Sequence, residues 1–228
     1  MKLAALVSGG KDSIYSLFLA KKEHEISVIV TMKSENPESY MFHVPGINLV
    51  KEQAVLMGIP IIFEETKGIK EEELEDLKNV IIEAKEKYEI EGVVSGAIAS
   101  KYQKDRIEKI CNELDLKSLT PLWGMEPNKL WKNMIDVGFE IIITAVAAGG
   151  LGKEWLGRKI DKTAVVELTN LHDMCYTCVI GEGGEYETLV LDCSLFKKRI
   201  KILKSKKIWQ KNTQSGELII EESILIDK

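Results

Sequence analysis

Cysteine and long apolar runs are both scarce in this chain. Its 228 residues include four cysteines, too few at this length for a disulfide scaffold. The longest apolar stretches, such as 139–146, are far shorter than a membrane-spanning helix, and Glu140 interrupts that one. The chain enters an apolar strand at Leu3, with no signal peptide before it. We therefore expect a cytoplasmic protein that has no membrane partner.

An excess of positive charge is also absent. The formal net charge is −5, which argues against a stable nucleic-acid partner. The basic run at 197–207 fits either a lysine-protected edge strand or a patch that meets a nucleic acid or an acidic protein. Hydrophobic residues make up 45% and charged residues 29%, as in globular proteins with one large or two small domains. A homo-oligomer is compatible with this composition.

The strongest functional signal lies near the N-terminus. Residues 8–13 read Ser-Gly-Gly-Lys-Asp-Ser and follow the apolar run 3–7 directly. The two glycines allow a sharp turn and a close approach of the backbone to a ligand. Apolar residues follow at helical spacing, so the loop opens a helix whose free N–H groups point back toward it. We predict a phosphate cradle of backbone amides and helix dipole. Three side chains add to it, those of Ser8, Lys11 and Ser13.

This loop is not of the Walker type. That motif requires a glycine at position 5 and a serine or threonine after the lysine, where this chain has Ala5 and Asp12. The pattern instead resembles the SGGxDS loop of the N-type ATP pyrophosphatases, which cleave ATP to AMP and pyrophosphate while adenylating a substrate. An ordinary corner between a strand and a helix is the alternative interpretation.

Short apolar segments alternate with amphipathic ones through the first two-thirds of the chain. Strands are predicted at 3–7, 26–31, 59–63, 92–95, 119–122 and 141–146. Helices are predicted at 13–22, 47–57, 71–88, 101–114 and 128–137. Gly58 and Gly138 follow two of these helices, where left-handed caps are expected. The alternation predicts an α/β fold with a doubly wound, mostly parallel sheet. Ligands of such sheets bind beyond the carboxyl ends of the strands, where residues 8–13 fall.

The pattern changes after Val146. Strand-like segments then occur at 164–168, 188–191, 200–204 and 218–226, and 214–216 is typical of a hairpin turn. We therefore expect two domains. They are an ATP-binding domain at 1–146 and a smaller α+β domain on the substrate side at 147–228.

A second unusual passage spans residues 181–188. Its three glycines and three glutamates, just before an apolar strand, suggest a loop that approaches a ligand and presents negative charge. Glu182 and Glu185 could bind magnesium, hold an ammonium ion or take a proton. A polar turn before a strand is the alternative.

The segment 96–106 follows the fourth predicted strand. Gly96 and Ala97 are small residues at the carboxyl end of that strand, which suits a nucleotide contact. The helix that follows carries three candidate substrate contacts, Tyr102, Gln103 and Arg106. Simple capping of this helix by Ser100 is the alternative.

Three further features give weaker signals. His43 lies in an aromatic-rich loop and could be a base, although a lone histidine is more often structural. Cys175 and Cys178 have redox or metal spacing with His172 nearby, but a second pair is missing, which favours a structural role. The acidic run 71–76 is interpreted as the solvated face of a helix whose apolar residues point inward.

Taken together, five passages resemble the diphthine–ammonia ligase family, a diphthamide-synthesis branch of the N-type ATP pyrophosphatases. They are SGGKDS at 8–13, ESYMFHVPG at 38–46, GAIASKYQKDRIEKIC at 96–111, LTPLW at 119–123 and GEGGEYETLVLD at 181–192. They keep their order over nearly the whole chain, which looks like the short archaeal form without the extra C-terminal domains of eukaryotic relatives. One position departs from the family. Ile180 stands where relatives often carry a cysteine, and Cys178 lies two residues earlier.

The resemblance implies an adenine nucleotide alpha hydrolase-like fold and an ATP-dependent amidation of diphthine on elongation factor 2. Ammonium would supply the nitrogen, AMP and pyrophosphate would be released, and ATP and Mg²⁺ are the implied cofactors, with Asp12 as the magnesium partner. The implied ATP contacts are Ser8, Gly9, Gly10, Lys11, Asp12, Ser13, Met32, Gly96 and Ala97. The implied catalytic residues are Lys11, Asp12, Glu182 and Glu185. The implied substrate contacts are Tyr102, Gln103, Arg106, Glu182, Glu185 and Tyr186.

Two other functions compete with this one. A tRNA-modifying enzyme of the same superfamily would adenylate a base before thiolation, which Cys175 and Cys178 favour and the acidic net charge disfavours. A regulatory module that binds ATP or AMP without turnover would need only the loop at 8–13.

Overall fold

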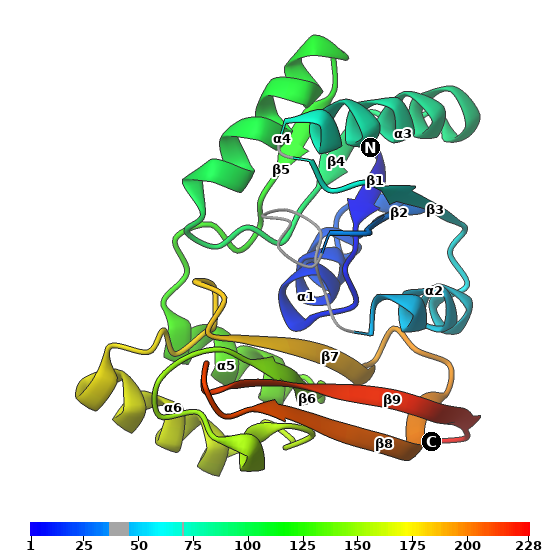
Figure 1. Ribbon diagram of the computed structural model, residues 1–228. Helices are drawn as coiled ribbons and strands as arrows, with labels where there is room; N and C mark the ends of the chain where they lie inside the picture. The colour runs from blue at the N-terminus through cyan, green and yellow to red at the C-terminus, as the bar shows by residue number, and fades with distance from the viewer. Residues whose placement is uncertain (37–45, 70) are drawn as a thin grey trace. The chain divides into compact units, whose positions relative to one another are not determined.

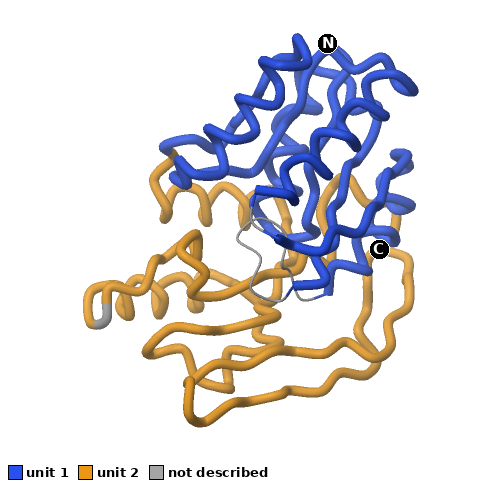
Figure 2. The backbone as a smooth tube through the Cα atoms, turned by 45° about the horizontal axis from the view of Figure 1, so that its top comes forward, with its two compact units in different colours: residues 1–124 blue, residues 125–228 orange. Residues whose placement is uncertain are grey.

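The computed structural model describes residues 1–36, 46–69 and 71–228. Its backbone divides into two compact units, residues 1–124 and 125–228 (Figure 2). The sequence pattern places the boundary after Val146 instead. The helix and strand between 127 and 146 therefore belong to the second unit rather than to the first.

The first unit contains a five-stranded parallel sheet. Its strand order is β3-β2-β1-β4-β5 (Figure 1). The strands are β1 (Lys2–Leu6), β2 (Glu25–Ser34), β3 (Ile61–Thr66), β4 (Gly92–Val94) and β5 (Lys117–Leu119). The chain runs outward from β1 to β3 and then crosses back to β4, so its direction across the sheet reverses between β1 and β4. This confirms the predicted doubly wound parallel sheet and places its topological switch point beside the end of β1.

Helices connect these strands and cover the sheet. They are α1 (Lys11–Ala20), the 3-10 helix η1 (Ile47–Leu49), α2 (Val50–Met57), α3 (Glu72–Tyr88) and α4 (Lys101–Glu113). Helices α3 and α4 pack on one face, and α1 and α2 lie on the other (Figure 1). The core under α3 includes Leu77, Ile81 and Ala84, which are fully buried. The acidic run at the start of α3 is therefore mostly the outer side of a helix, as predicted.

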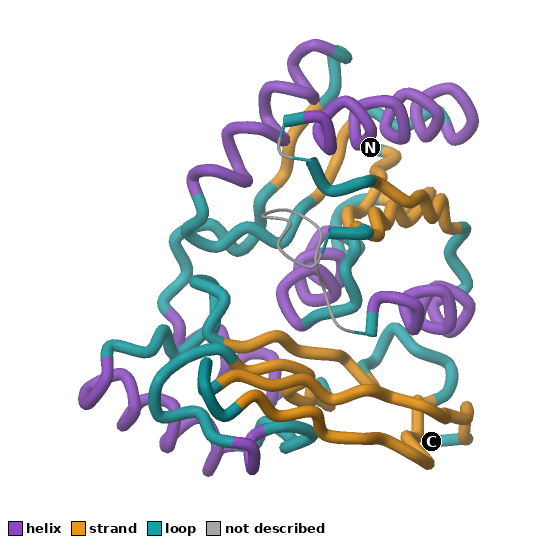
Figure 3. The backbone as a smooth tube through the Cα atoms, in the orientation of Figure 1, coloured by secondary structure: helices purple, strands orange, loops and turns teal. Residues whose placement is uncertain are grey.

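The second unit is built on an antiparallel sheet of order β7-β6-β9-β8 (Figure 3). Its strands are β6 (Glu140–Val146), β7 (Tyr186–Asp192), β8 (Arg199–Gln210) and β9 (Ser215–Ile226). The prediction that 141–146 joins the parallel sheet is wrong, because β6 pairs with β7 and β9. A nearly continuous apolar strand can be buried in either kind of sheet, so its residues do not reveal its partners.

The segment 164–168 is helical rather than extended. It lies within α6 (Lys162–Cys175), whose N-terminus is capped by Asp161, with the Ala164 N–H donating to its carboxylate at 2.9 Å. Ala164 and Leu168 are fully buried, whereas Val166 is 59% exposed. Val165 and Val166 are β-branched, which favours a strand. The two buried residues, however, are four positions apart, which is the spacing of one face of a helix. Helix α5 (Pro127–Asp136) and the 3-10 helix η2 (Lys153–Trp155) complete the unit.

Turns and element ends follow the sequence closely. Gly58 and Gly138 have φ values of 65° and 82°, which confirms the left-handed caps. Strands β8 and β9 form the predicted terminal hairpin, but its turn lies at 211–214 rather than 214–216, because Ser215 and Gly216 already belong to β9. Strand β3 is displaced toward the C-terminus from the predicted 59–63, and β5 toward the N-terminus from 119–122. Within the described ranges, the helices are too short or too polar to cross a membrane.

Two substitutions in α6 test the corrected assignment. We expect Leu168→Ala to lower the free energy of unfolding by about 2–5 kcal/mol, because it opens a cavity in the core. Val166→Ala should change it by no more than about 0.5 kcal/mol, because this side chain is exposed. Urea titration followed by circular dichroism measures both. A strand would place positions 166 and 168 on the same face, so equal losses would contradict the helix.

Candidate functional site

The switch point of the parallel sheet brings together two segments that lie far apart in the sequence. The loop 8–13 follows β1, and Gly96 follows β4, the neighbouring strand. A Cβ atom on Gly96 would lie 2.8 Å from the carbonyl carbon of Asp12 and 2.8 Å from the amide nitrogen of Ser13. The Ser16 hydroxyl also donates to the Ser95 carbonyl at 2.6 Å. Gly96 therefore packs directly against the first turn of α1, which explains why a small residue is needed there.

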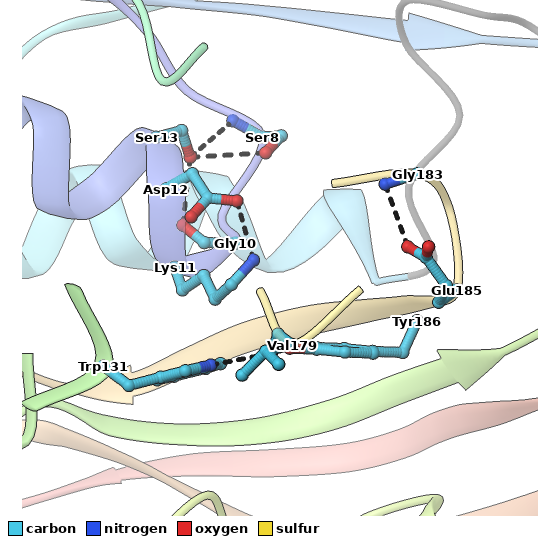
Figure 4. Close-up of polar contacts among 10 residues, drawn as sticks. All are labelled: Ser8, Gly10, Lys11, Asp12, Ser13, Trp131, Val179, Gly183, Glu185 and Tyr186. Carbon is cyan, nitrogen blue, oxygen red and sulfur yellow. Dashed lines mark hydrogen bonds and ion pairs between the residues drawn. The ribbon is translucent and has the colours of Figure 1, made fainter. Parts of the chain in front are cut away.

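The Ser13 hydroxyl accepts one hydrogen bond and donates another, and both hold the shape of the loop (Figure 4). It accepts from the Ser8 amide at 3.2 Å and donates to the Gly10 carbonyl at 3.1 Å. Gly9 adopts a left-handed conformation with φ of 85°, which a side chain would strain. Gly10 is the cap residue of α1 and has no side chain with which to cap the helix. The N–H groups and the dipole at the start of a helix favour an anion.

Lys11 and Asp12 form an ion pair at the start of α1 (Figure 4). The Nζ atom of Lys11 lies 2.7 Å from Oδ2 of Asp12. Only 3% of the Lys11 side chain is exposed, against 27% of Asp12. A buried ammonium needs a partner to offset its desolvation, and Asp12 supplies one. The pair thus fixes the Lys11 ammonium at the loop, and the second oxygen of Asp12, Oδ1, is buried beside it.

The residues of this loop fit a nucleotide phosphate and a magnesium ion. Mg²⁺ is usually held by one or two carboxylates together with substrate phosphates, and Asp12 could serve as such a carboxylate. In the part of the chain that the structure describes, no three histidine, cysteine or acidic side chains are grouped as a protein-only metal site.

Two predicted nucleotide contacts are buried side chains. Met32 is 4% exposed and belongs to the core between the sheet and α3, and Ala97 is 5% exposed. Neither side chain is available to a ligand, so a contact at these positions would use the backbone. A nucleotide contact at Met32 and Ala97 stays a prediction.

The predicted substrate contacts on α4 already form contacts within the first unit. Arg106 donates to Glu71 at 2.6 Å, and its guanidinium lies 3.5 Å from the centre of the Tyr102 ring. The hydrogen bond to Glu71 raises the pKa of Arg106, which keeps its charge in place. Ser100 accepts a hydrogen bond from the Gln103 amide at 3.4 Å and so caps the helix. The capping role is confirmed, while substrate binding here stays a prediction.

The glutamate-rich loop of the second unit is held by Glu185. One carboxylate oxygen accepts from the Gly183 amide at 2.9 Å (Figure 4), and the other accepts from the Cys178 amide at 3.2 Å. Glu185 therefore fixes the shape of the segment between 178 and 185. Glu182, in the same loop, is half-buried.

Tyr186, which the family resemblance implies as a substrate contact, is a buried side chain. It is 2% exposed, and its hydroxyl donates to the Val179 carbonyl at 2.6 Å. The Trp131 indole donates to the same carbonyl at 2.9 Å (Figure 4). Gly181 has φ of 72°, and a Cβ there would lie 2.7 Å from the tyrosine ring. Tyr186 thus supports the loop from beneath.

The described cysteines give little support for a redox or metal site. Cys111 and Cys193 are buried, and burial raises the pKa of each thiol to about 11. Cys178 is half-buried and forms no disulfide with another described side chain. The Cys175 side chain and His43 lie outside the described part of the chain, as does most of the passage 38–46.

One residue at this site has no counterpart among the predictions. Gln53 in α2 is fully buried, and its Nε2 donates to the Gly9 carbonyl at 3.1 Å. A glutamine in an amphipathic helix ordinarily indicates a solvent-facing position. The signal that could have revealed it is its place between Val50 and Ala54, in the apolar stripe of the helix.

Gly96→Ala tests the contact between β4 and α1. The added methyl group must displace the backbone at Asp12 and Ser13, so we expect phosphate-ligand affinity to fall at least tenfold with a lower melting temperature. Gly149→Ala is the matched control, because nothing lies within 4 Å of a Cβ at that position. Titration calorimetry with ATP and thermal melting measure the two effects. Unchanged affinity in Gly96→Ala would remove this contact from the site.

Comparison with known proteins identifies the family. Residues 1–118 match the model of the diphthamide synthase N-terminal domain, and 126–226 match that of the C-terminal domain. A diphthine–ammonia ligase of Rattus norvegicus is 36% identical over 222 residues, which cover 88% of this chain and 82% of the rat protein. The Homo sapiens enzyme of the same name is 35% identical with the same coverage. For that of Schizosaccharomyces pombe the identity is 35%, covering 96% of this chain and 38% of the yeast protein.

A search of solved structures gives a more distant match. It is described as a predicted subunit of tRNA methyltransferase from Methanocaldococcus jannaschii, with 16% identity and a TM-score of 0.42. The match covers 85% of this chain and 98% of that one, and a likeness of this size does not bear on function. The two family models together cover most of the sequence and meet near the division between the two units. The chain belongs to the diphthamide synthase family.

Proposed function

We propose that this protein is an ATP-dependent ligase that converts the carboxylate of diphthine on elongation factor 2 into the amide of diphthamide. Ammonium supplies the nitrogen, and AMP and pyrophosphate are released. The observation that carries the proposal is the anion-binding loop at the switch point of the sheet, found in a chain whose relatives are named diphthine–ammonia ligases.

The chemistry explains why a nucleotide is needed. A carboxylate resists attack by ammonia because its leaving group would be oxide. In the first step, a carboxylate oxygen attacks the α-phosphorus of ATP, and the bond from that phosphorus to pyrophosphate breaks. In the second, ammonium gives up a proton to become ammonia, whose nitrogen attacks the acyl carbon; the bond to AMP breaks, and the nitrogen loses a second proton to solvent. Atoms and charge balance without any oxidant or reductant.

The loop at 8–13 is suited to the first step. The N–H groups at the start of α1 would bind the β- and γ-phosphates and leave the α-phosphorus open to attack. The Lys11 ammonium would stabilise the charge that develops on the departing pyrophosphate. Mg²⁺, held by Asp12 and the phosphates, would add positive charge at the same place.

The second-unit loop is suited to a cationic partner. Both ammonium and the trimethylammonium group of diphthine carry positive charge, which the carboxylates of Glu182 and Glu185 would attract. The contacts of Glu185 with two backbone amides support a role in shaping this loop. We assign Glu182 to the cation and Glu185 to the loop that presents it.

The decisive experiment supplies the complete set of substrates. Elongation factor 2 bearing diphthine is incubated with the protein, ATP and isotopically labelled ammonium. We expect label in the factor, the small mass decrease of a carboxyl-to-amide change, and AMP with pyrophosphate by phosphorus NMR. Lys11→Met should slow turnover by about 100-fold or more, because a preorganised charge is lost. Lys21→Met, at the exposed far end of α1, is its control.

Two results would overturn this proposal. If ADP and phosphate are the main products, the loop does not direct attack to the α-phosphorus. If ATP and AMP bind but no amide forms under any of these conditions, the protein is a nucleotide-binding module rather than a ligase.

Glu185→Gln separates the acceptor side from the nucleotide side. An amide presents one accepting oxygen in place of two, so one of the two backbone N–H contacts is lost and the loop relaxes. We expect amidation to fall steeply. The affinity for ATP should stay within about threefold, which is about 0.6 kcal/mol of binding free energy, because Glu185 does not belong to the loop at 8–13. Glu222→Gln is the control for a solvent-exposed glutamate in the same unit. If ATP affinity collapses together with activity, these carboxylates belong to the nucleotide site instead.

A further inference from the structure

Gln53 is placed to control the conformation of the phosphate loop. It lies in α2, it is 0% exposed, and its Nε2 donates to the Gly9 carbonyl at 3.1 Å. The same side chain also packs against the loop, because a Cβ on Gly9 would lie 3.0 Å from its Oε1 atom and 2.9 Å from Cγ2 of Val50. The loop therefore contacts α2 at Gly9, a residue that has no side chain to restrict its backbone.

The contact with Gln53 matters because it sets the orientation of the peptide bond between Gly9 and Gly10. A trans peptide is planar, and its C=O and N–H groups point in opposite directions. When Gln53 holds the Gly9 carbonyl toward α2, the N–H of Gly10 must point away from α2. A peptide between two glycines turns over more readily than any other, because neither residue has a Cβ that restricts φ and ψ. Without the Gln53 contact, this N–H could point either way.

The next peptide is fixed by other means. The Gly10 carbonyl accepts from the Ser13 hydroxyl at 3.1 Å and from the Ile14 amide at 3.2 Å, so it belongs to the first turn of α1. The Ser8 amide donates to the Ser13 hydroxyl at 3.2 Å, which holds the other side of the loop. The Gly9–Gly10 peptide lies between these two restrained points, and Gln53 holds its carbonyl.

We propose that Gln53 is a positioning residue that turns the Gly10 N–H toward the pyrophosphate portion of the bound nucleotide. It contacts no substrate and acts through the Gly9 carbonyl. The inference rests on the proposed function only in that the loop must bind phosphate. A purely structural glutamine would instead contribute to the stability of the fold and affect all ligands alike.

Two variants remove the donor and keep the approximate size of the side chain. Gln53→Met is nearly isosteric and cannot donate, and Gln53→Glu cannot donate when ionised. Inorganic pyrophosphate and AMP are titrated separately by calorimetry, because only pyrophosphate occupies the proposed cradle. We expect affinity for pyrophosphate to fall about tenfold to 100-fold, the range for one lost hydrogen bond to a charged group. Affinity for AMP should stay within about twofold.

Leu56→Val is the matched control for a loss of packing in the same helix. Leu56 is 3% exposed, so this change should lower the melting temperature to a similar degree. It removes no donor from the loop, and affinity for pyrophosphate should stay at the wild-type value. A fall in affinity that tracks the melting temperature across all three variants would show that stability alone is responsible.

The remaining outcomes are equally decisive. If the wild-type protein binds neither pyrophosphate nor ATP, the proposed function fails. If it binds both and folded Gln53→Met binds pyrophosphate equally well, the positioning role alone is wrong. A parallel loss of pyrophosphate and AMP affinity also overturns it. If neither variant folds, Gln53 is a core residue and the positioning role is withdrawn.

Discussion

The close approach of Gly96 to the first turn of α1 is the constraint on which the candidate site depends. A hydrogen atom in place of a side chain lets the end of β4 lie against the backbone of Asp12 and Ser13. The start of α1 can then lie directly beyond two adjacent parallel strands, where helix dipole and strand ends converge. A larger residue at position 96 would push the helix away and open the cradle. The catalytic proposal thus rests on a packing contact that involves no catalytic group.

Around that contact, polar side chains restrain a loop that glycine makes flexible. Ser13 holds one side of it, Gln53 holds the central carbonyl, and the buried pair of Lys11 and Asp12 keeps charge at its end. The second unit uses the same strategy. There Glu185 binds two amides of its own loop, while Trp131 and Tyr186 both donate to the Val179 carbonyl beneath it. In both units the glycines permit the loop shape, and buried donors and acceptors select it.

Prediction from sequence succeeded where a signal is local. The turn at 8–13 between a strand and a helix, the order of strands and helices through residue 119 and the glycine caps each depend on neighbouring residues, and the structure confirms them. Prediction from sequence failed where the outcome depends on contacts made in the folded chain. The strand at 140–146 was assigned to the wrong sheet because apolar residues specify burial but not the strand beside them. The segment 164–168 was read as a strand because its β-branched residues outweighed the helical spacing of its two buried ones. Tyr186 was read as a ligand contact, although its hydroxyl is satisfied inside the fold.

The sequence by itself determined the family, the glycine-containing turn at 8–13 and the parallel fold of the first unit. Each of these follows from short motifs and from the periodicity of apolar residues, which are properties of consecutive positions. Only the tertiary structure decided which polar side chains support the loops and which remain available to a ligand. Gln53 binds a carbonyl 44 positions away, whereas Glu185 and Tyr186 bind groups of their own loop, and the burial of all three depends on how the chain packs. A hydrogen bond to a distant carbonyl has no fixed spacing in sequence, because it is set by how the helices and strands pack.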